Sequence, residues 1–423
     1  MENLINDLVD FLNKSHSEYN ACNNIKNIFL ENNFIELNEG DNFEVERGKN
    51  YFLTRNDSSI VAFKIPAMLR RFDFTIMASH LDSPCLKIKM DNGVRSYGYH
   101  KLNVEVYGGL ITSTWLDKPL SIAGRIFYKN NDKVETKIID IDKPVLIIPN
   151  VCIHFNRNIN NGFIYNPEVD LKPIMSLGEE NNSIMKLLCS YTSLKEEDVI
   201  SYDLNVYNYE KSMVGGINNE FLMSPKIDNL ESAYLSLRSF LDSGETENIK
   251  VYVSFDNEEI GSETYGGADG DFLKNTLKRI SNSLGFSENN FYAALANSFL
   301  VSIDNGHAVH PNHPELSDPN NLVYLDKGPI IKFNSNMAYM SDAYTSSLVI
   351  DVCKKNNIPY QFFYNKSDVR GGSTLGALST SQIGIKTCDI GCAQLSMHSS
   401  YETAGTKDVD YMYELIKDIY NQR

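Results

Sequence analysis

The hydrophobic pattern in the second half of the chain alternates between strand-like and helix-like segments. In residues 249–255 every second side chain is apolar, with Val251, Val253 and Phe255 on one side, as in a half-buried strand. In residues 228–242 apolar side chains recur every three or four positions, as on one face of a helix. Strands that alternate with helices predict a mostly parallel sheet covered by helices on both faces.

The same pattern extends through most of residues 1–91 and 221–423. We expect helices at 2–14, 17–32, 228–242, 269–284, 341–356, 374–383 and 408–421. We expect strands near 43–55, 59–64, 249–255, 299–304, 328–333, 360–364 and 385–390, and one more buried strand that ends at His80. Together these segments predict one discontinuous α/β domain with a mixed, mostly parallel sheet flanked by helices.

The pattern changes between residues 92 and 220. Short alternating runs such as "KLNVEVYGG", "SIAGRIFYK" and "ISYDLNVYN" are separated by turns rich in Gly, Asn and Pro, and helical spacing is nearly absent. We therefore expect a β-rich module over 92–220, inserted into the α/β domain formed by 1–91 and 221–423.

Composition restricts the classes of function. The 423 residues exceed one ordinary domain, and 42% apolar with 22% charged residues is typical of a globular protein. A net charge of −16 argues against nucleic-acid or anionic-membrane partners, because such surfaces need clustered Lys and Arg. No segment approaches the roughly 18–20 apolar residues of a membrane span, and the acidic start argues against a targeting peptide. Seven scattered cysteines without a CxxC pair favour reduced thiols and a cytoplasmic location.

Polar residues able to bind metal or move protons follow several predicted strands. Ligands of open α/β sheets bind beyond the carboxyl ends of the strands. Such positions are held by His80 with Asp82, by Glu258 with Glu259, and by Asp304. His398 follows an apolar–polar run, and Asp228 stands at the head of the helix at 228–242.

Each of these residues also has a purely structural interpretation. Asp228 could be only an N-cap, with Glu231 completing a capping-box pattern. Asp304 before Asn-Gly could be a turn former, and His398 a hydrogen-bonded loop histidine. The acidic residues after Phe255 could form a solvated loop. The His80–Asp82 pair is more suggestive, because such a carboxylate can fix the tautomer of a metal-bound imidazole.

Taken as a set, two imidazoles and several carboxylates suit two divalent cations about 3.5–4 Å apart that share a bridging carboxylate. Such a site polarises a carbonyl group and lowers the pKa of a bridging water, and it then needs a base for the water's proton. Adjacent Glu258 and Glu259 can divide these tasks, one binding metal and the other accepting the proton.

Several motifs, in order and spacing, resemble the M18 family of metallo-aminopeptidases, the aspartyl aminopeptidases. They are "SHLDSPCLKIK", "SPKIDNLE", "DNEEIGS", "SIDNGHAVHPNHPE", "GPIIKFNSN" and "QLSMHSSYE". The resemblance extends from "FLNKSHSEYN" near the start to "SMHSSYETAGTKDV" near the end, and "DVRGGSTLG" is similar to the bacterial branch of the family.

The resemblance implies a role for each matching residue. His80 and Asp304 would bind one metal, Glu259 and His398 the other, and Asp228 would bridge them. Glu258 would be the general base and acid, with Asp82 as the partner of His80. Lys332 would face an acidic substrate side chain, Tyr339 would assist at the scissile carbonyl, and His154 would reach the active site of a neighbouring subunit.

The resemblance further implies two divalent cations per subunit, with zinc as the first choice and manganese or cobalt as alternatives. It implies a homo-oligomer, a tetrahedral dodecamer built from dimers, with the inserted β module as the dimerisation domain. His307, His310 and His313 are interpreted as pocket-wall and dimer-contact residues, not as a further metal site.

The resulting hypothesis is a metal-dependent aminopeptidase that removes N-terminal Asp or Glu from peptides. One alternative keeps the chemistry and changes the substrate to neutral or basic N-terminal residues, or to an acylated amine. A second alternative is an inactive member of the family that serves as a binding protein. The sequence argues against it, because every expected ligand and the base are present.

Overall fold

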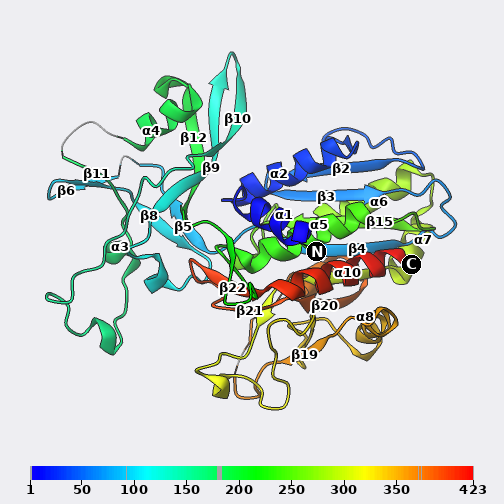
Figure 1. Ribbon diagram of the computed structural model, residues 1–423. Coiled ribbons are helices and arrows are strands. Elements are labelled where there is room, and N and C mark those ends of the chain that lie inside the picture. The colour runs from blue at the N-terminus through cyan, green and yellow to red at the C-terminus, as the bar shows by residue number, and fades with distance from the viewer. Residues whose placement is uncertain (1, 92, 179–182, 370, 373, 423) are drawn as a thin grey trace.

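The computed structural model describes residues 2–91, 93–178, 183–369, 371–372 and 374–422. Its larger part is an α/β domain around a nine-stranded sheet, and a smaller β-rich part projects from one end of that sheet (Figure 1). The predicted fold class is therefore confirmed.

The nine-stranded sheet is mixed, and its four central strands are all parallel. Across the sheet the strands are β1 (Ile35–Glu36), β2 (Asn50–Arg55), β3 (Ser59–Lys64), β15 (Ile249–Phe255), β4 (Phe74–His80), β16 (Phe299–Ile303), β20 (Lys386–Gly391), β18 (Ile330–Phe333) and β19 (Gln361–Tyr364). The central strands β15, β4, β16 and β20 are buried almost throughout, because helices cover both faces of a parallel sheet.

Two hydrophobic cores fill the two faces of this sheet. Tyr252, Met77 and Val301 point to one face and pack against α1 (Glu2–Leu12), α2 (Glu18–Glu31), α5 (Ile227–Asp242), α8 (Ala343–Asn356) and α10 (Thr406–Asn421). Their strand neighbours point to the other face, which is covered by α6 (Phe272–Ser283), α7 (Glu288–Asn297) and α9 (Leu375–Ile383). Successive side chains of a strand point to opposite faces of the sheet, so each strand contributes residues to both cores.

The inserted part contains a five-stranded antiparallel sheet with its own hydrophobic core. Its strands, in order, are β10 (Lys133–Asp140), β9 (Leu120–Asn130), β12 (Val199–Asn208), β5 (Cys85–Ile88) and β8 (Val104–Tyr107). Around it lie β11 (Ile174–Leu177), β7 (Tyr99–Lys101), β6 (Val94–Ser96), α3 (Pro167–Asp170) and α4 (Ile184–Thr192).

Besides the three-stranded sheet formed by β11, β7 and β6, a further five-stranded sheet connects the end of the insert to the last part of the chain. It consists of β13 (Met213–Gly215), β14 (Phe221–Ser224), β22 (Glu402–Gly405), β21 (Ala393–Leu395) and β17 (Gly306–His307). Hydrogen bonding therefore places β5 with the insert and β13 with the larger part. Both pairings cross the expected boundaries at 91/92 and 220/221 by a few residues.

Most predicted elements lie where the hydrophobic pattern placed them, within two or three residues at each end. The expected strand near 43–55 is an exception, because only Asn50–Arg55 pairs and residues 43–49 form a loop. Three helices of the described residues were not predicted. One is α7, which begins at a Ser287–Asn290 capping box, and the others are α3 and α4 in the region interpreted as β-rich. Among the described residues no helix has the length and apolar character needed to cross a membrane.

Candidate metal centre

The sheet brings most of the predicted ligands to one edge. His80 is the last residue of β4, Asp304 follows β16, and Glu258 and Glu259 lie in the 3₁₀ turn η4 (Glu258–Ile260) that follows β15. These three strands are parallel neighbours, so their carboxyl ends lie at the same edge.

The other two predicted ligands come from outside the strands of that sheet. Asp228 lies at the start of α5, before the regular helix begins, and its backbone is not helical. His398 follows β21 and has a left-handed backbone with φ of 66°. The N-cap interpretation of Asp228 is wrong, because Lys226 holds the N-cap position of α5 and the Asp228 carboxylate faces the two histidines.

Asp228 lies between the two imidazoles. Its Oδ1 is 3.6 Å from Nε2 of His80, and its Oδ2 is 3.6 Å from Nε2 of His398. His80 Nε2 is 3.8 Å from Asp304 Oδ1, and His398 Nε2 is 3.3 Å from Glu259 Oε2. Three groups of possible ligand atoms lie within 4.8 Å of one another, and two of them, His80–Asp228–Asp304 and Asp228–Glu259–His398, share Asp228. The third group is His80–Glu258–Glu259.

These groups fit divalent cations. Imidazole nitrogens with carboxylate oxygens are the ligand types that zinc, manganese and cobalt bind in proteins. Buried Asp228 Oδ1 and Glu259 Oε1 have no hydrogen-bond partner among the described residues. Such orphaned acceptors are costly unless a cation or water satisfies them.

Without a bound cation, the protein balances the negative charge of these clustered carboxylates poorly. Burial lowers the pKa of His80, but the surrounding carboxylates Asp228, Asp304 and Asp82 outweigh burial and raise that pKa well above its usual value. Burial, with Asp228 nearby, raises the pKa of Glu259 well above its usual value. Without a cation, the negative charge is thus balanced by protons on some carboxylates and by an imidazolium group beside others. A bound divalent cation would take over this role.

Glu258 lies beside the two groups that contain Asp228 and belongs to neither of them. Its Oε2 is 3.9 Å from His80 Nε2, and the residue lines the cleft. Burial raises the pKa of Glu258 to about 8, and the nearby Asp304 adds to this shift. A raised pKa is typical of a carboxylate that accepts and returns a proton.

Two carboxylates hold the ligands through their backbone. Asp82 Oδ1 lies 3.3 Å from His80 Nδ1, whose hydrogen-bond partner is the Asp82 backbone carbonyl at 3.1 Å. The Asp82 carboxylate accepts the backbone N–H groups of Glu258 and Glu259 at 3.1 Å. Glu402 was not predicted, although it ends the motif "QLSMHSSYE". It accepts the N–H of Asp228 at 3.0 Å and that of His398 at 2.7 Å.

A cleft of about 500 Å³ opens over these groups. Lys332 and Tyr339 are among the residues that line it. The Lys332 ammonium donates to the Asn305 carbonyl at 2.8 Å and lies 3.6 Å from Asp304 Oδ2. Buried Asp389, also not predicted, accepts hydrogen bonds from Thr374 Oγ1 and the Met340 N–H, both at 2.6 Å, and so connects two walls of the cleft.

Other predicted residues lie outside this group. His154 is exposed on the insert and is not among the residues that line the cleft. His307 lines the cleft, whereas His310 and His313 are exposed beside each other, with ring centroids 5.3 Å apart. In "DVRGGSTLG", Arg370 and Ser373 lie outside the described residues.

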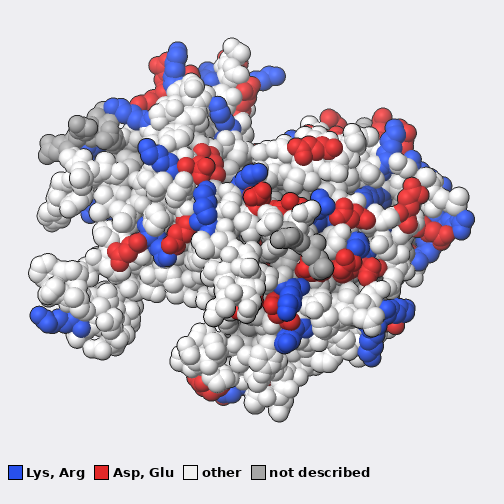
Figure 2. Space-filling model, in the orientation of Figure 1, with Lys and Arg blue, Asp and Glu red and all other residues white. Residues whose placement is uncertain are grey.

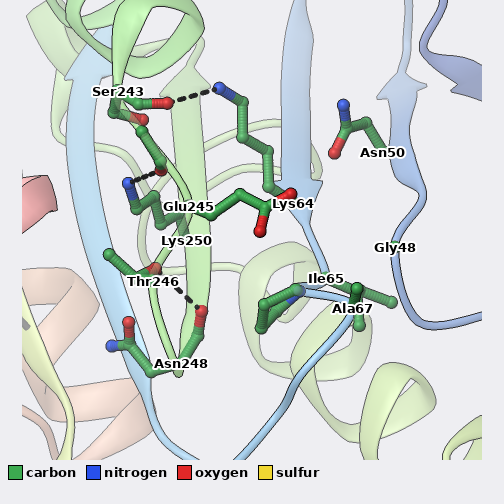
Figure 3. Close-up of a pocket in the computed structure, with 12 residues that line it drawn as sticks. Gly48, Asn50, Lys64, Ile65, Ala67, Ser243, Glu245, Thr246, Asn248 and Lys250 are labelled. Carbon is green, nitrogen blue, oxygen red and sulfur yellow. Dashed lines mark hydrogen bonds between the residues drawn. The ribbon is translucent and has the colours of Figure 1, made fainter.

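A second cavity, of about 320 Å³, lies at the opposite end of β15 (Figure 3). Lys64 and Lys250 face each other there as directly opposite residues of β3 and β15. Lys64 donates to the carbonyls of Phe240 and Leu241, and Lys250 donates to that of Gly244. The Lys64 ammonium thus caps the end of α5, where a cation is favourable, and Lys250 bonds to the loop that follows the helix, so we interpret this cavity as structural.

Comparison with known proteins places this chain in a family. The family described as "Aminopeptidase I zinc metalloprotease (M18)" matches residues 11–420. A "Probable M18 family aminopeptidase 2" of Clostridium acetobutylicum is 41% identical over 98% of both chains. An "Aspartyl aminopeptidase" of Dictyostelium discoideum is 35% identical over 98% of this chain and 96% of its own.

A solved structure, "Cryo-EM structure of the Ape4 and Nbr1 complex", superimposes with a TM-score of 0.96. That chain is 33% identical, and the match covers 99% of this chain and 85% of the other. The family match and the curated relatives therefore show that this chain belongs to the M18 family and is a metallo-aminopeptidase.

Proposed function

We propose that the chain removes N-terminal Asp or Glu residues from peptides at two divalent cations, held by His80 with Asp304 and by Glu259 with His398, and shared by Asp228. The observation that carries the proposal is the position of Asp228 between both imidazoles, at 3.6 Å from each. When bound, the cations supply an activated water and polarise the scissile carbonyl. Zinc is our first choice, with manganese and cobalt as alternatives.

Glu258 serves as the base and then as the acid. It takes one proton from the attacking water while the water oxygen bonds to the carbonyl carbon. When the C–N bond breaks, Glu258 returns that proton to the leaving amine. Asp82 holds the turn that aims Glu258, because it accepts the backbone N–H of this residue. Tyr339, in the wall of the cleft, donates to the carbonyl oxygen as negative charge develops there.

Lys332 selects the acidic side chain of the substrate. An ammonium group has three donors, and the structure gives the Lys332 ammonium one acceptor, the Asn305 carbonyl, with Asp304 3.6 Å away. It is a positive group in the wall of a cleft whose floor is otherwise acidic. The name of the Dictyostelium relative supports the same preference.

The test combines two variants with a panel of chromogenic substrates that carry Asp, Glu, Leu, Lys or Ala. Glu258→Gln should lower kcat by about 10²–10⁴ and leave the metal content unchanged. Lys332→Met should reduce turnover of the Asp and Glu substrates and spare the others. Cleavage of Leu or Lys substrates by the unchanged chain would favour the alternative specificity. Full activity of Glu258→Gln would reject the role given to this residue.

We also propose that the chain forms a homo-oligomer, a dodecamer of dimers by family resemblance, with the insert at the dimer contact. Several large apolar side chains of the insert are exposed, among them Val151, Ile153, Phe155, Phe163 and Ile164. The lobe of the insert that holds this stretch is mostly uncharged, whereas charged side chains are spread over the α/β part (Figures 1 and 2). An apolar patch of this kind is typical of a subunit interface, and His154 lies within it.

The cytoplasm remains the proposed location. Five of the seven free cysteines are buried, and burial raises the pKa of Cys85, Cys353 and Cys388 to about 12. Such thiols are unreactive and serve as packing residues.

A further inference from the structure

One segment of the insert, Tyr107–Ile111, lies directly against the candidate metal centre of its own chain. It continues from the end of β8. The Tyr107 hydroxyl is buried and donates to Asp82 Oδ2 at 2.7 Å, and it accepts a hydrogen bond from Asn257 Nδ2 at 3.0 Å. Asp82 follows β4 and Asn257 follows β15, so one hydroxyl of the insert joins the segments after two different strands of the large sheet.

The two glycines that follow allow the backbone to approach the ligands closely. At Gly108, whose φ is +73°, an added Cβ would lie 3.1 Å from Cβ of Glu259 and 3.4 Å from Pro84. At Gly109 an added Cβ would lie 3.4 Å from Nδ1 of His398. A Cβ at Gly108 would press on Glu259, and the φ of +73° there also favours glycine, whereas a Cβ at Gly109 would lie in ordinary van der Waals contact with His398.

The backbone of the segment also holds His398 on both sides. The Gly109 carbonyl is 3.1 Å from His398 Nδ1, and the Ile111 N–H donates to the His398 carbonyl at 2.9 Å. A carbonyl oxygen can only accept, so Nδ1 carries the hydrogen and Nε2 is left to face Asp228 and Glu259.

We propose that the Tyr107–Ile111 segment is a positioning element of the metal centre. It orients His398, limits the movement of Glu259, and fixes Asp82 and through it the turn that carries Glu258. The insert therefore completes the site within each subunit, in addition to any contact between subunits. The inference rests on the proposed function only in taking Glu259 and His398 as metal ligands.

A matched pair of glycine variants tests the proposal. Gly98 is also in the insert and has φ of +78°, but an added Cβ there meets nothing within 4 Å. Gly108→Ala and Gly98→Ala thus impose similar backbone strain, and only the first presses on a ligand. We expect Gly108→Ala to weaken metal affinity by about 10–100-fold, the usual cost of losing support for a ligand. Gly98→Ala should bind metal as the unchanged chain does.

Metal affinity is measured on the full-length protein by dialysis against buffered Zn²⁺, with the bound metal determined by mass spectrometry. Cobalt loading adds a direct readout, because the visible absorption bands of Co²⁺ report the ligand geometry. These bands should shift in Gly108→Ala and stay unchanged in Gly98→Ala. Identical binding curves and spectra for the two variants would overturn the proposal.

If Gly108→Ala does not fold, Tyr107→Phe tests the same positioning role. It removes only the hydroxyl, so Asp82 loses one donor while the packing of the ring is kept. Metal affinity should fall about tenfold or more, and kcat should fall more than KM rises. An unchanged metal-binding curve would overturn the positioning role, whatever happens to activity. An unchanged chain that binds metal but cleaves no aminoacyl substrate would instead reject the proposed reaction and leave this inference standing.

Discussion

At the scale of single residues, the metal centre depends on carboxylates that lie outside the candidate ligand set. Asp82 and Glu402 each accept two backbone N–H groups, and those groups belong to Glu258, Glu259, Asp228 and His398. A backbone held in this way fixes the origin of each ligand side chain, which is what a pre-organised site requires.

Glu402→Gln tests this support. The amide keeps the shape of the side chain but replaces one acceptor oxygen by an NH₂ donor, which then faces the N–H of Asp228 or of His398. We expect metal affinity to fall by about 10–100-fold, measured by metal titration of the chelated protein. Glu315→Gln, at an exposed glutamate, is the control. Equal affinities in the two variants would contradict the role of Glu402.

At the scale of elements, α2 is anchored to the sheet by one aromatic side chain. The fully buried ring of Phe29 lies 4.8–6.1 Å from the rings of Phe34, Phe52, Phe240 and Tyr252. Phe29→Ala should lower the free energy of unfolding by about 3–5 kcal/mol, because it leaves a cavity among these rings.

Denaturant unfolding measures this loss, and the neighbouring position on the same helix provides the control. Leu30 is 45% exposed, so Leu30→Ala should change stability by no more than about 0.5 kcal/mol. A similar midpoint for both variants would show that α2 contributes little to the core.

The lysine pair between β3 and β15 predicts a pH dependence of stability. Burial lowers the pKa of Lys64 to about 8 and, with Lys64 nearby, that of Lys250 to about 7. In the unfolded chain a lysine has a pKa of about 10.4. Between these values the unfolded state binds more protons, so stability should rise with pH from about 7 towards 10 and be lost as pH falls through this range.

Urea unfolding at pH 7, 8 and 9 measures this slope. Lys250→Met keeps the length of the buried stem and removes the charge, so its stability should depend less on pH than that of the unchanged chain (Figure 3). Lys133→Met, at an exposed lysine of the insert, should keep the original slope. An unaltered slope in Lys250→Met would mean that this lysine is protonated equally in both states.

At the scale of the whole molecule, a metal at the candidate centre would join parts of the chain that are far apart in sequence. The candidate ligands come from three strands of the large sheet, from α5 and from the loop after β21. Chelation should abolish activity and lower the melting temperature, since a ligand at 100 times its Kd stabilises the folded state by about 2.7 kcal/mol. Zinc, manganese or cobalt should restore both. A melting temperature that is unchanged by chelation would argue against a metal at this position.

The insert is the proposed contact between subunits, so substitutions at its exposed apolar residues should change the oligomeric state. Phe155 is 88% exposed and Ile164 is 90% exposed. Phe155→Asp combined with Ile164→Asp should dissociate the assembly, because the charges would be buried without partners at the interface. Sedimentation velocity measures this change. Met68→Asp, at an exposed position outside the insert, is the control. An unchanged sedimentation coefficient in the double variant would place the contact elsewhere.

Periodicity in the sequence was enough to predict the class of the fold and most helices and strands, because buried faces repeat locally along the chain. The chemistry of the candidate ligands was also readable, since each follows an apolar strand or begins an apolar helix. Family resemblance then supplied their division into two metal groups, which the residues alone left open.

The partners that hold the site could be found only in three dimensions. Glu402 bonds to Asp228 across 174 positions, and Tyr107 bonds to Asp82 across 25. These bonds use backbone N–H groups or a hydroxyl, and neither leaves a periodic pattern in the sequence. The sequence thus determined which residues are chemically able to bind metal. The tertiary structure decided which of them meet, and which buried groups keep them in place, because both depend on contacts between segments that are distant along the chain.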